Sequence, residues 1–113
     1  MSTTTLLPAD AAATLSLPAA VQHAEAGIVS RTVLQTPELR IVLFAFAAGQ
    51  ELTGHSSQRR AVVHILTGAC EFEFNGSPQR LEAGALLHLP PGHPHAVRAT
   101  EGPFAMLLTL ASC

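Results

Sequence analysis

The chain has 113 residues, a length that suits one domain built around one hydrophobic core. Hydrophobic residues make up 48% of the chain and charged residues only 12%, against roughly 25% in an average globular protein, so we expect part of the surface to be buried in an oligomer. The formal net charge is −2 and all six cations are arginines; they form no phosphate-neutralising patch, so nucleic acid is not expected as a partner.

Residues 1–26 are rich in Ala, Thr, Ser and Pro. Two prolines, Pro8 and Pro18, limit helix formation in this stretch. We interpret residues 1–26 as an extended N-terminal arm with one helical turn, capped by Asp10 and running through Ala13. An arm of this kind can pack across a neighbouring subunit.

The same stretch lacks the basic start and the unbroken apolar run of a signal peptide, and no other segment is long enough to cross a bilayer. A membrane association is therefore not expected. The two cysteines, Cys70 and Cys113, do not make a disulfide framework, and we interpret them as a small core residue and a free C-terminal thiol. Both features favour a cytoplasmic protein.

From Ile28 onwards, short β-branched and alternating runs are separated by turn signals. Strands are predicted at Ile28–Leu34, Leu39–Ala47, Arg60–Thr67, Cys70–Phe74, Pro78–Leu81, Leu86–Leu89, His95–Ala99 and Phe104–Leu110. The segment Glu51–Arg59 is predicted to be a loop that carries His55. Eight or nine short strands without a long helical pattern indicate an all-β sandwich or barrel.

Two of these strands carry more specific predictions. The strand Arg60–Thr67 is apolar on both faces, and one barrel interior covers only one face, so we expect a homodimer that buries the other face. The pair Asn75–Gly76 follows the alternating run Cys70–Phe74 and predicts a type I′ hairpin turn, in which both central residues have φ > 0.

The segment Gly84–Val97 carries the chemistry of the chain. Pro90, Pro91 and Gly92 predict a rigid corner between strands, because proline fixes φ and lacks an N–H. His93 and His95 follow, and alternation places both on one face of the departing segment. A stiff corner that presents imidazoles suits a metal ion or a polar ligand.

Two spaced sets of residues resemble the paired motifs of the cupin superfamily: Gly49, His55 and Gly68 fit the first motif, and Gly84, Pro90, Gly92 and His95 fit the second. The resemblance covers roughly Ile28 to Leu110. It implies a small single-domain cupin with an RmlC-like jelly roll, that is, a double-stranded β-helix barrel over residues 27–113 preceded by the arm. In that family the matched histidines bind a divalent metal ion inside the barrel.

The first motif is degenerate. Ser57 and Ala61 stand at the positions of its second histidine and its glutamate, and Ala99 replaces the asparagine of the second motif. The resemblance therefore implies that His55 and His95 hold a divalent ion (zinc, nickel, iron or manganese) only weakly, with His93 as a substitute ligand. The smaller side chains would also enlarge the pocket, whose remaining candidates are Ser57, Ala61, Glu51, His64, Phe44 and Phe46.

The orientation of His64 depends on the alternation of its strand. If Ala61 faces the barrel interior, His64 faces outward into a subunit contact, and a β-bulge would reverse this. His88, in the apolar strand before the corner, and His23, in the arm, are not expected to bind a ligand.

Three functions follow from these observations. The chain is a cupin with a weak or altered metal site, or a metal-free module that binds a small apolar or weakly acidic molecule, or an oligomer without a ligand. Retention of His55 and His95 argues against the third function, and the lost ligand positions argue against a strong form of the first. The first two functions are nearly level, and a small cupin with a residual histidine site is favoured. The residues do not decide between catalysis and binding, and they identify no substrate.

Overall fold

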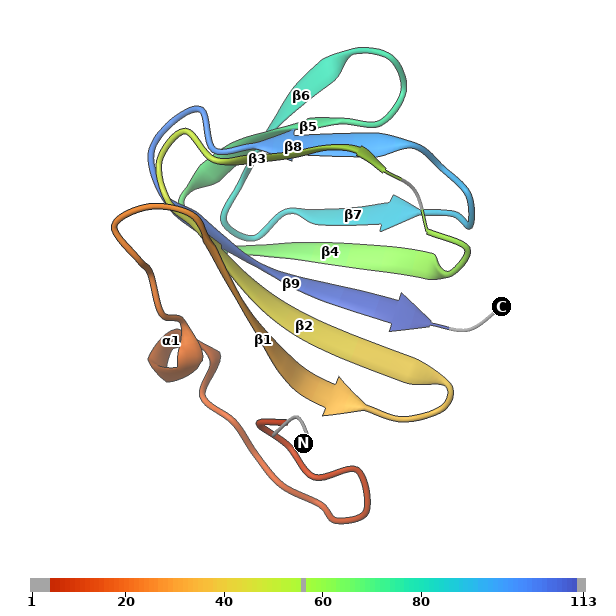
Figure 1. Cartoon of the computed structure of the whole chain (residues 1–113). Coiled ribbons are helices and arrows are strands. Elements are labelled where there is room, and N and C mark those ends of the chain that lie inside the picture. Colours follow the sequence, from red (N-terminus) through yellow and green to blue (C-terminus); the bar gives the residue numbers. More distant parts are fainter. Residues whose placement is uncertain (1–4, 56, 112–113) are drawn as a thin grey trace.

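The computed structural model describes residues 5–55 and 57–111, and for residues 54 and 55 it describes the backbone alone. One short helix and nine strands make up the fold (Figure 1). The helix is α1 (Leu17–Ala20), and the strands are β1 (Ile28–Gln35), β2 (Leu39–Phe46), β3 (Glu51–His55), β4 (Arg60–Thr67), β5 (Ala69–Glu73), β6 (Pro78–Glu82), β7 (Leu86–Leu89), β8 (His95–Arg98) and β9 (Phe104–Ala111). No helix in these described ranges is long and apolar enough to span a bilayer.

The strands form two antiparallel sheets that pack face to face. The five-stranded sheet has the order β1-β2-β9-β4-β7 and the four-stranded sheet has the order β3-β8-β5-β6. From β2 onwards the chain crosses repeatedly between the sheets, so that strands distant in sequence, such as β4 and β9, lie side by side (Figure 1). This is the expected double-stranded β-helix, and the predicted fold class is confirmed.

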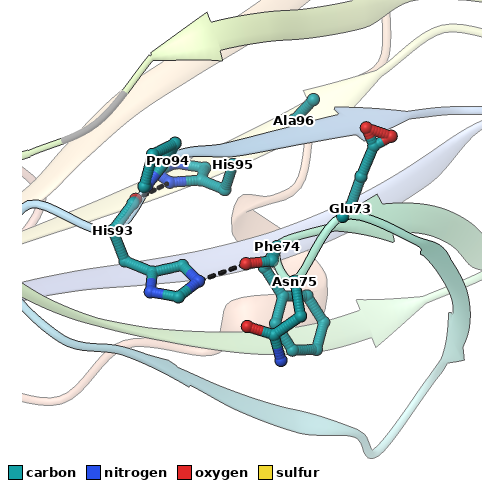
Figure 2. A pocket seen from close by; sticks show the side chains of 8 residues that line it. Glu73, Phe74, Asn75, His93, Pro94, His95 and Ala96 are labelled. Atoms are coloured by element: carbon teal, nitrogen blue, oxygen red, sulfur yellow. Dashed lines mark hydrogen bonds between the residues drawn. The ribbon is translucent and has the colours of Figure 1, made fainter.

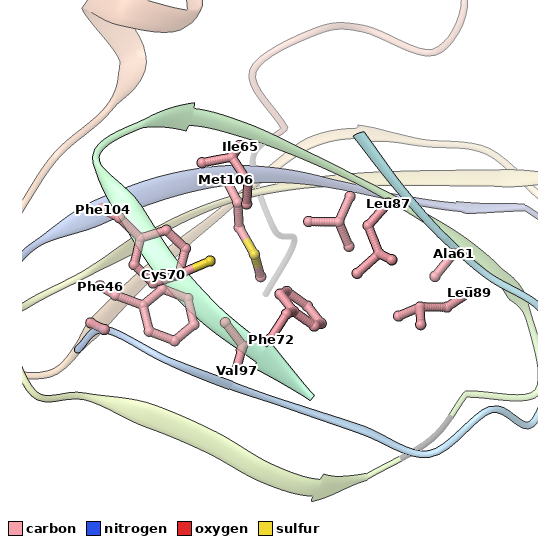
Figure 3. Close-up of a cluster of buried hydrophobic side chains, with 12 residues drawn as sticks. Phe46, Ala61, Ile65, Cys70, Phe72, Leu87, Leu89, Val97, Phe104 and Met106 are labelled. Atoms are coloured by element: carbon pink, nitrogen blue, oxygen red, sulfur yellow. The ribbon is translucent and has the colours of Figure 1, made fainter. Parts of the chain in front are cut away.

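The hydrophobic core lies between the two sheets. Inward-facing residues of both sheets meet there, because every second side chain of a strand points to the same face. The rings of Phe46 and Phe104 stack with centroids 4.5 Å apart, a contact that adds about 1 kcal/mol to the burial of their surface. Ile65, Cys70 and Phe72 fill the space beside them (Figure 3).

The outer face of the four-stranded sheet is charged. In the registers of the sheet, Glu51, Arg98, Glu71 and Arg80 occupy one row across all four strands, with alternating sign. Arg98 contacts the carboxylates of Glu51 at 3.2 Å and Glu71 at 3.6 Å. These contacts lie at the surface, where an ion pair is typically worth about 0.2–1 kcal/mol, so this face is solvated rather than packed.

The outer face of the five-stranded sheet is apolar, and the arm covers part of it. Buried Ala20 of α1 packs with Val33 and Leu43 of the sheet. The backbone N–H groups of Leu6 and Leu7 donate to carbonyls of β1, which is an edge strand. Figure 1 shows this segment on the side of the sheet away from the core.

The helical turn of the arm is displaced from its predicted place. The structure has no helix at Asp10–Ala13; it has α1 at Leu17–Ala20, with a proline in the first turn. The missing N–H of Pro18 costs nothing there, because the first N–H groups of a helix have no intrahelical acceptor. Serine is favoured before such a turn, but the Ser16 side chain makes no capping hydrogen bond.

Two further predictions are wrong. Glu51–His55 is the strand β3 rather than a loop, because its backbone pairs with β8. The connection after β5 is not a type I′ turn. The register pairs Glu73 with Pro78, which leaves four residues in the loop, and Gly76 has φ +82° while no non-glycine residue in the described chain has positive φ.

Candidate functional site

A small cavity lies inside the barrel, between the two sheets. Its volume is about 40 Å³, which is room for only a few water molecules. Inward-facing residues of six strands line it: Phe44, Leu52, Val63, Phe72, His95, Val97, Met106 and Leu108. His95 is the one residue in this lining with a polar side chain. The described wall of the cavity therefore combines apolar side chains with the imidazole of His95.

The backbone of the proline corner fixes the position of His95. The N–H of Gly92 donates to the carbonyl of Ser57 at 2.6 Å, and the N–H of His93 donates to that of Pro90 at 3.2 Å. Gly92 has φ +77°, a conformation that a residue with a side chain rarely adopts. The corner thus delivers β8 with His95 as its first residue, facing the interior.

The ring of His95 is held in one orientation. Its Nδ1 donates to the carbonyl oxygen of His93 at 3.1 Å, because a carbonyl can only accept. The ring stacks on Phe72, with centroids 6.1 Å apart. In the neutral imidazole the lone pair then belongs to Nε2. This is the arrangement that prepares a histidine to accept a hydrogen bond or to ligate a metal.

A second, open hollow of about 480 Å³ lies outside the cavity, between the β5–β6 loop and the proline corner (Figure 2). Its lining consists of Glu73, Phe74, Asn75, Gly76, His93, Pro94, His95 and Ala96. His93 crosses the gap between the two segments, because its Nε2 donates to the carbonyl oxygen of Phe74. His95 lines both the hollow and the cavity, so the two spaces adjoin at this residue.

The other predicted pocket residues lie in different places. Phe44 lines the cavity, whereas Phe46 and Ala61 belong to the packed core. Glu51 is exposed on the charged outer face, where it contacts Arg98. The side chain of Ser57 is turned back to its own loop, since its Oγ accepts from the N–H of Arg59 at 3.0 Å.

His64 is directed away from the cavity. Ala61, Val63 and Ile65 are buried in the core, so the alternating positions of β4, which include His64, belong to the outer face. The one register irregularity of β4 against β9 falls after Ile65 and does not change this.

Of the predicted metal ligand His55, the structure describes the backbone. Its backbone ends β3 and pairs directly with His95 in the antiparallel ladder. Its side chain lies outside the described residues.

The described residues do not fit a full metal-ligand set. No group of three His, Cys, Asp or Glu side chains that could hold an ion occurs among them. First-row ions that bind imidazole and carboxylate normally take four to six donors. At the cavity the described wall offers one such donor, His95, and the position of the family's glutamate is filled by buried Ala61.

Several lining residues were not predicted. Leu52, Phe72 and Val97 line the cavity, and alternation from His95 could have identified Val97 as an inward neighbour. Leu52 was missed because β3 was predicted to be a loop. Glu73 lines the hollow, and nothing in the sequence distinguishes it from Glu71, two residues earlier on the same strand face.

A family model identifies the family of this chain. The family model described as a cupin domain matches residues 42–110. No curated protein matches this chain. Among solved structures, a conserved protein of unknown function from Streptococcus pyogenes is 33% identical, with a TM-score of 0.83 over 100% of this chain and 96% of that one.

Two further structures carry the cupin name. An RmlC-like cupin protein from Desulfovibrio desulfuricans is 32% identical, with a TM-score of 0.79 over 89% of this chain and 97% of that one. A cupin superfamily protein from Desulfitobacterium hafniense has a TM-score of 0.84 at 24% identity, over 96% of each chain. The second similarity concerns the fold alone.

Proposed function

This chain belongs to the cupin superfamily, and on that premise we propose that it is a small-molecule binding module whose ligand reaches from the hollow into the barrel cavity. The observation that carries the proposal is the position of His95, which lines both spaces. A bound molecule would place an apolar group against Val63 and Val97 and a polar group beside the ring of His95.

The size of the cavity limits the apolar group. A volume of about 40 Å³ is much less than the roughly 150 Å³ of a dry cavity that accepts benzene. We therefore propose a short alkyl group rather than an aromatic ring for this end of the ligand. The unbranched side chain of Met106 on the wall can adapt to small differences in shape.

A second candidate function is weak binding of a divalent ion such as zinc, nickel, iron or manganese. It is favoured by one observation, the direct backbone pairing of His55 with His95 between β3 and β8. Two imidazoles supply fewer donors than such ions prefer, so this site would bind weakly and would need water or ligand oxygens.

Two measurements on untagged protein test these functions. Elemental analysis of protein purified without a His tag should find much less than one metal ion per chain if the binding module is correct. Near-stoichiometric metal that His95→Gln removes would favour the second candidate. For the binding module, NMR titration with short alkyl fragments should shift the methyl signals of Val63 and Val97.

Two histidine variants make the titration specific. His95→Gln should weaken fragment binding, because the amide cannot reproduce the ring that stacks on Phe72. His88→Gln is the matched control, because His88 lies on the exposed part of β7 and lines neither space. Fragments that shift no cavity signal in the parent protein would overturn the proposal.

We also propose that the chain forms a homodimer through the part of the five-stranded sheet that the arm leaves uncovered. Leu86 is 71% exposed there, next to half-buried His64 and Val62. The face of the other sheet carries charged side chains, so it offers no comparable apolar surface. A second copy of the same apolar face is the complement that a two-fold contact supplies.

A further inference from the structure

One carboxylate on the outer face of the four-stranded sheet differs from its neighbours. The others contact arginines: Glu51 and Glu71 contact Arg98, and Glu82 and Glu101 contact Arg80. Glu73 follows Glu71 on the same face of β5 but makes no ion pair or hydrogen bond within the described part of the chain. Within the described residues, no arginine contacts this carboxylate.

Glu73 is also the carboxylate that lines the hollow. None of the other seven lining residues is an Asp, Glu, Lys or Arg. Figure 2 shows its carboxylate on one side of the hollow and the imidazoles of His93 and His95 on the other. Within the described lining of the hollow, the carboxylate of Glu73 is therefore the source of negative charge.

One neighbour of Glu73 reinforces this character, because the side-chain amide of Asn75 offers a further acceptor oxygen. Phe74 also lines the hollow, but its side chain packs against the core on the other face from Glu73. His93 already donates its Nε2 proton to the carbonyl of Phe74, so this proton does not serve an anion in the hollow.

We propose that the hollow selects ligands with a cationic head, such as a primary or substituted amine, and that Glu73 is the residue that determines this specificity. The inference rests on the proposed function, in which the alkyl end of the same ligand enters the cavity past His95. It replaces the weakly acidic ligand considered from the sequence, because a carboxylate head would face an uncompensated negative charge.

Three fragments with the same alkyl chain separate head-group charge from apolar binding: butylamine, butan-1-ol and butyrate. Dissociation constants come from NMR titration, followed on cavity methyl signals at neutral pH. We expect butylamine to bind roughly two- to fivefold more tightly than butan-1-ol, the range that a single surface ion pair supports, and butyrate to bind most weakly.

Two variants assign the effect to one carboxylate. Glu73→Gln should bring the three dissociation constants within roughly twofold of one another. The variant removes the negative charge that attracts the amine and repels the carboxylate. Glu71→Gln is the matched control: it lies on the same face of the same strand but does not line the hollow, and its charge is already compensated by Arg98. It should leave the order of the fragments unchanged.

The outcomes distinguish this inference from the function on which it rests. If the fragments shift the cavity signals but butylamine is not preferred, or Glu73→Gln leaves the preference intact, selection by Glu73 is wrong and the binding module stands. If no fragment shifts the cavity signals, both fail. Preference for butylamine that Glu73→Gln abolishes and Glu71→Gln retains supports both.

Discussion

The Nδ1 atom of His95 donates a hydrogen bond of 3.1 Å to the carbonyl oxygen of His93, two residues earlier in the chain. The contact predicts the tautomer of the neutral ring, with the proton on Nδ1. His93 should be the opposite tautomer, because its Nε2 donates to the carbonyl of Phe74. His88 should match His95, because Arg60 donates to its Nε2 at 2.6 Å.

Long-range ¹H–¹⁵N correlation spectra at mildly alkaline pH measure these tautomers directly. Nitrogen shifts that place the proton of His95 on Nε2 would contradict the geometry of the proline corner. The solvated His23 of the arm provides the reference for a ring whose tautomer no contact determines.

Two glycines with positive φ should differ in their response to alanine. Gly76→Ala should cost about 1–2 kcal/mol of unfolding free energy from backbone strain alone, because an added Cβ meets nothing within 4 Å. Gly68→Ala should cost more, because its Cβ would lie 2.6 Å from the carbonyl oxygen of Pro103 as well. Urea denaturation gives both values, and equal costs would show that the Gly68 turn relaxes freely.

The thiol of Cys70 should be unreactive in the folded protein. It is buried, and burial, helped by the charge of Glu101, raises its pKa to about 11. A thiol reagent at pH 8, applied to a Cys113→Ser variant, should therefore label Cys70 only at the rate of unfolding. Labelling as fast as that of a free thiol would place Cys70 at the surface.

The same shift gives a stability effect at alkaline pH. The folded pKa lies above the ordinary value of 9.0, so the stabilisation is complete below about pH 9 and is lost as the pH rises towards about 11. In this window the unfolded chain ionises first. Melting temperatures measured from pH 8 to 11 should fall less steeply for Cys70→Ala than for the parent protein.

Arg80 lowers the pKa of the Glu101 carboxyl, first through their hydrogen bond of 2.6 Å. A lowered folded pKa contributes stability above the unfolded value and loses it as pH falls through the folded value. Replacing Arg80 with Gln should therefore return the pKa of Glu101 towards its ordinary range. Carboxyl ¹³C shifts measured against pH would test this, and an unchanged titration would refute the contact.

The proposed homodimer depends on Leu86, the large hydrophobic side chain that stands 71% exposed on β7. Leu86→Glu should give a monomer in light scattering at micromolar concentration, because two carboxylates would meet at a two-fold contact. Gln79→Glu, on exposed β6 of the other sheet, should leave the dimer intact. A parent protein that is already monomeric at this concentration would refute the proposal.

The strands whose bounds were predicted correctly are next to a glycine or a proline, which ends a strand. Arg60–Thr67 and Leu86–Leu89 have the predicted bounds, since glycine or proline bounds each on at least one side. β3 was missed because it contains Gly54 and polar residues and becomes a strand only by pairing with β8. Tertiary pairing here overrides a weak local preference.

Only part of the candidate site could be predicted from the sequence. The proline corner and His95 could be located from residue types alone, because proline and glycine constrain the backbone locally. The importance of Glu73 could not, since Glu71 and Glu73 look alike in the sequence. They differ only because the register places Arg98 opposite Glu71 and a small residue, Ala96, opposite Glu73.

The row of alternating charges on the four-stranded sheet also bears on how its strands meet during folding. The four charged residues of this row come from four strands, some of which are far apart in the chain: Glu51, Arg98, Glu71 and Arg80. Their alignment therefore forms late in folding, and other registers of the strands compete with it. A slip of one residue in any of these strands would turn its charged side chain into the apolar interior. These contacts therefore contribute more to choosing a single alignment than to holding the finished sheet together.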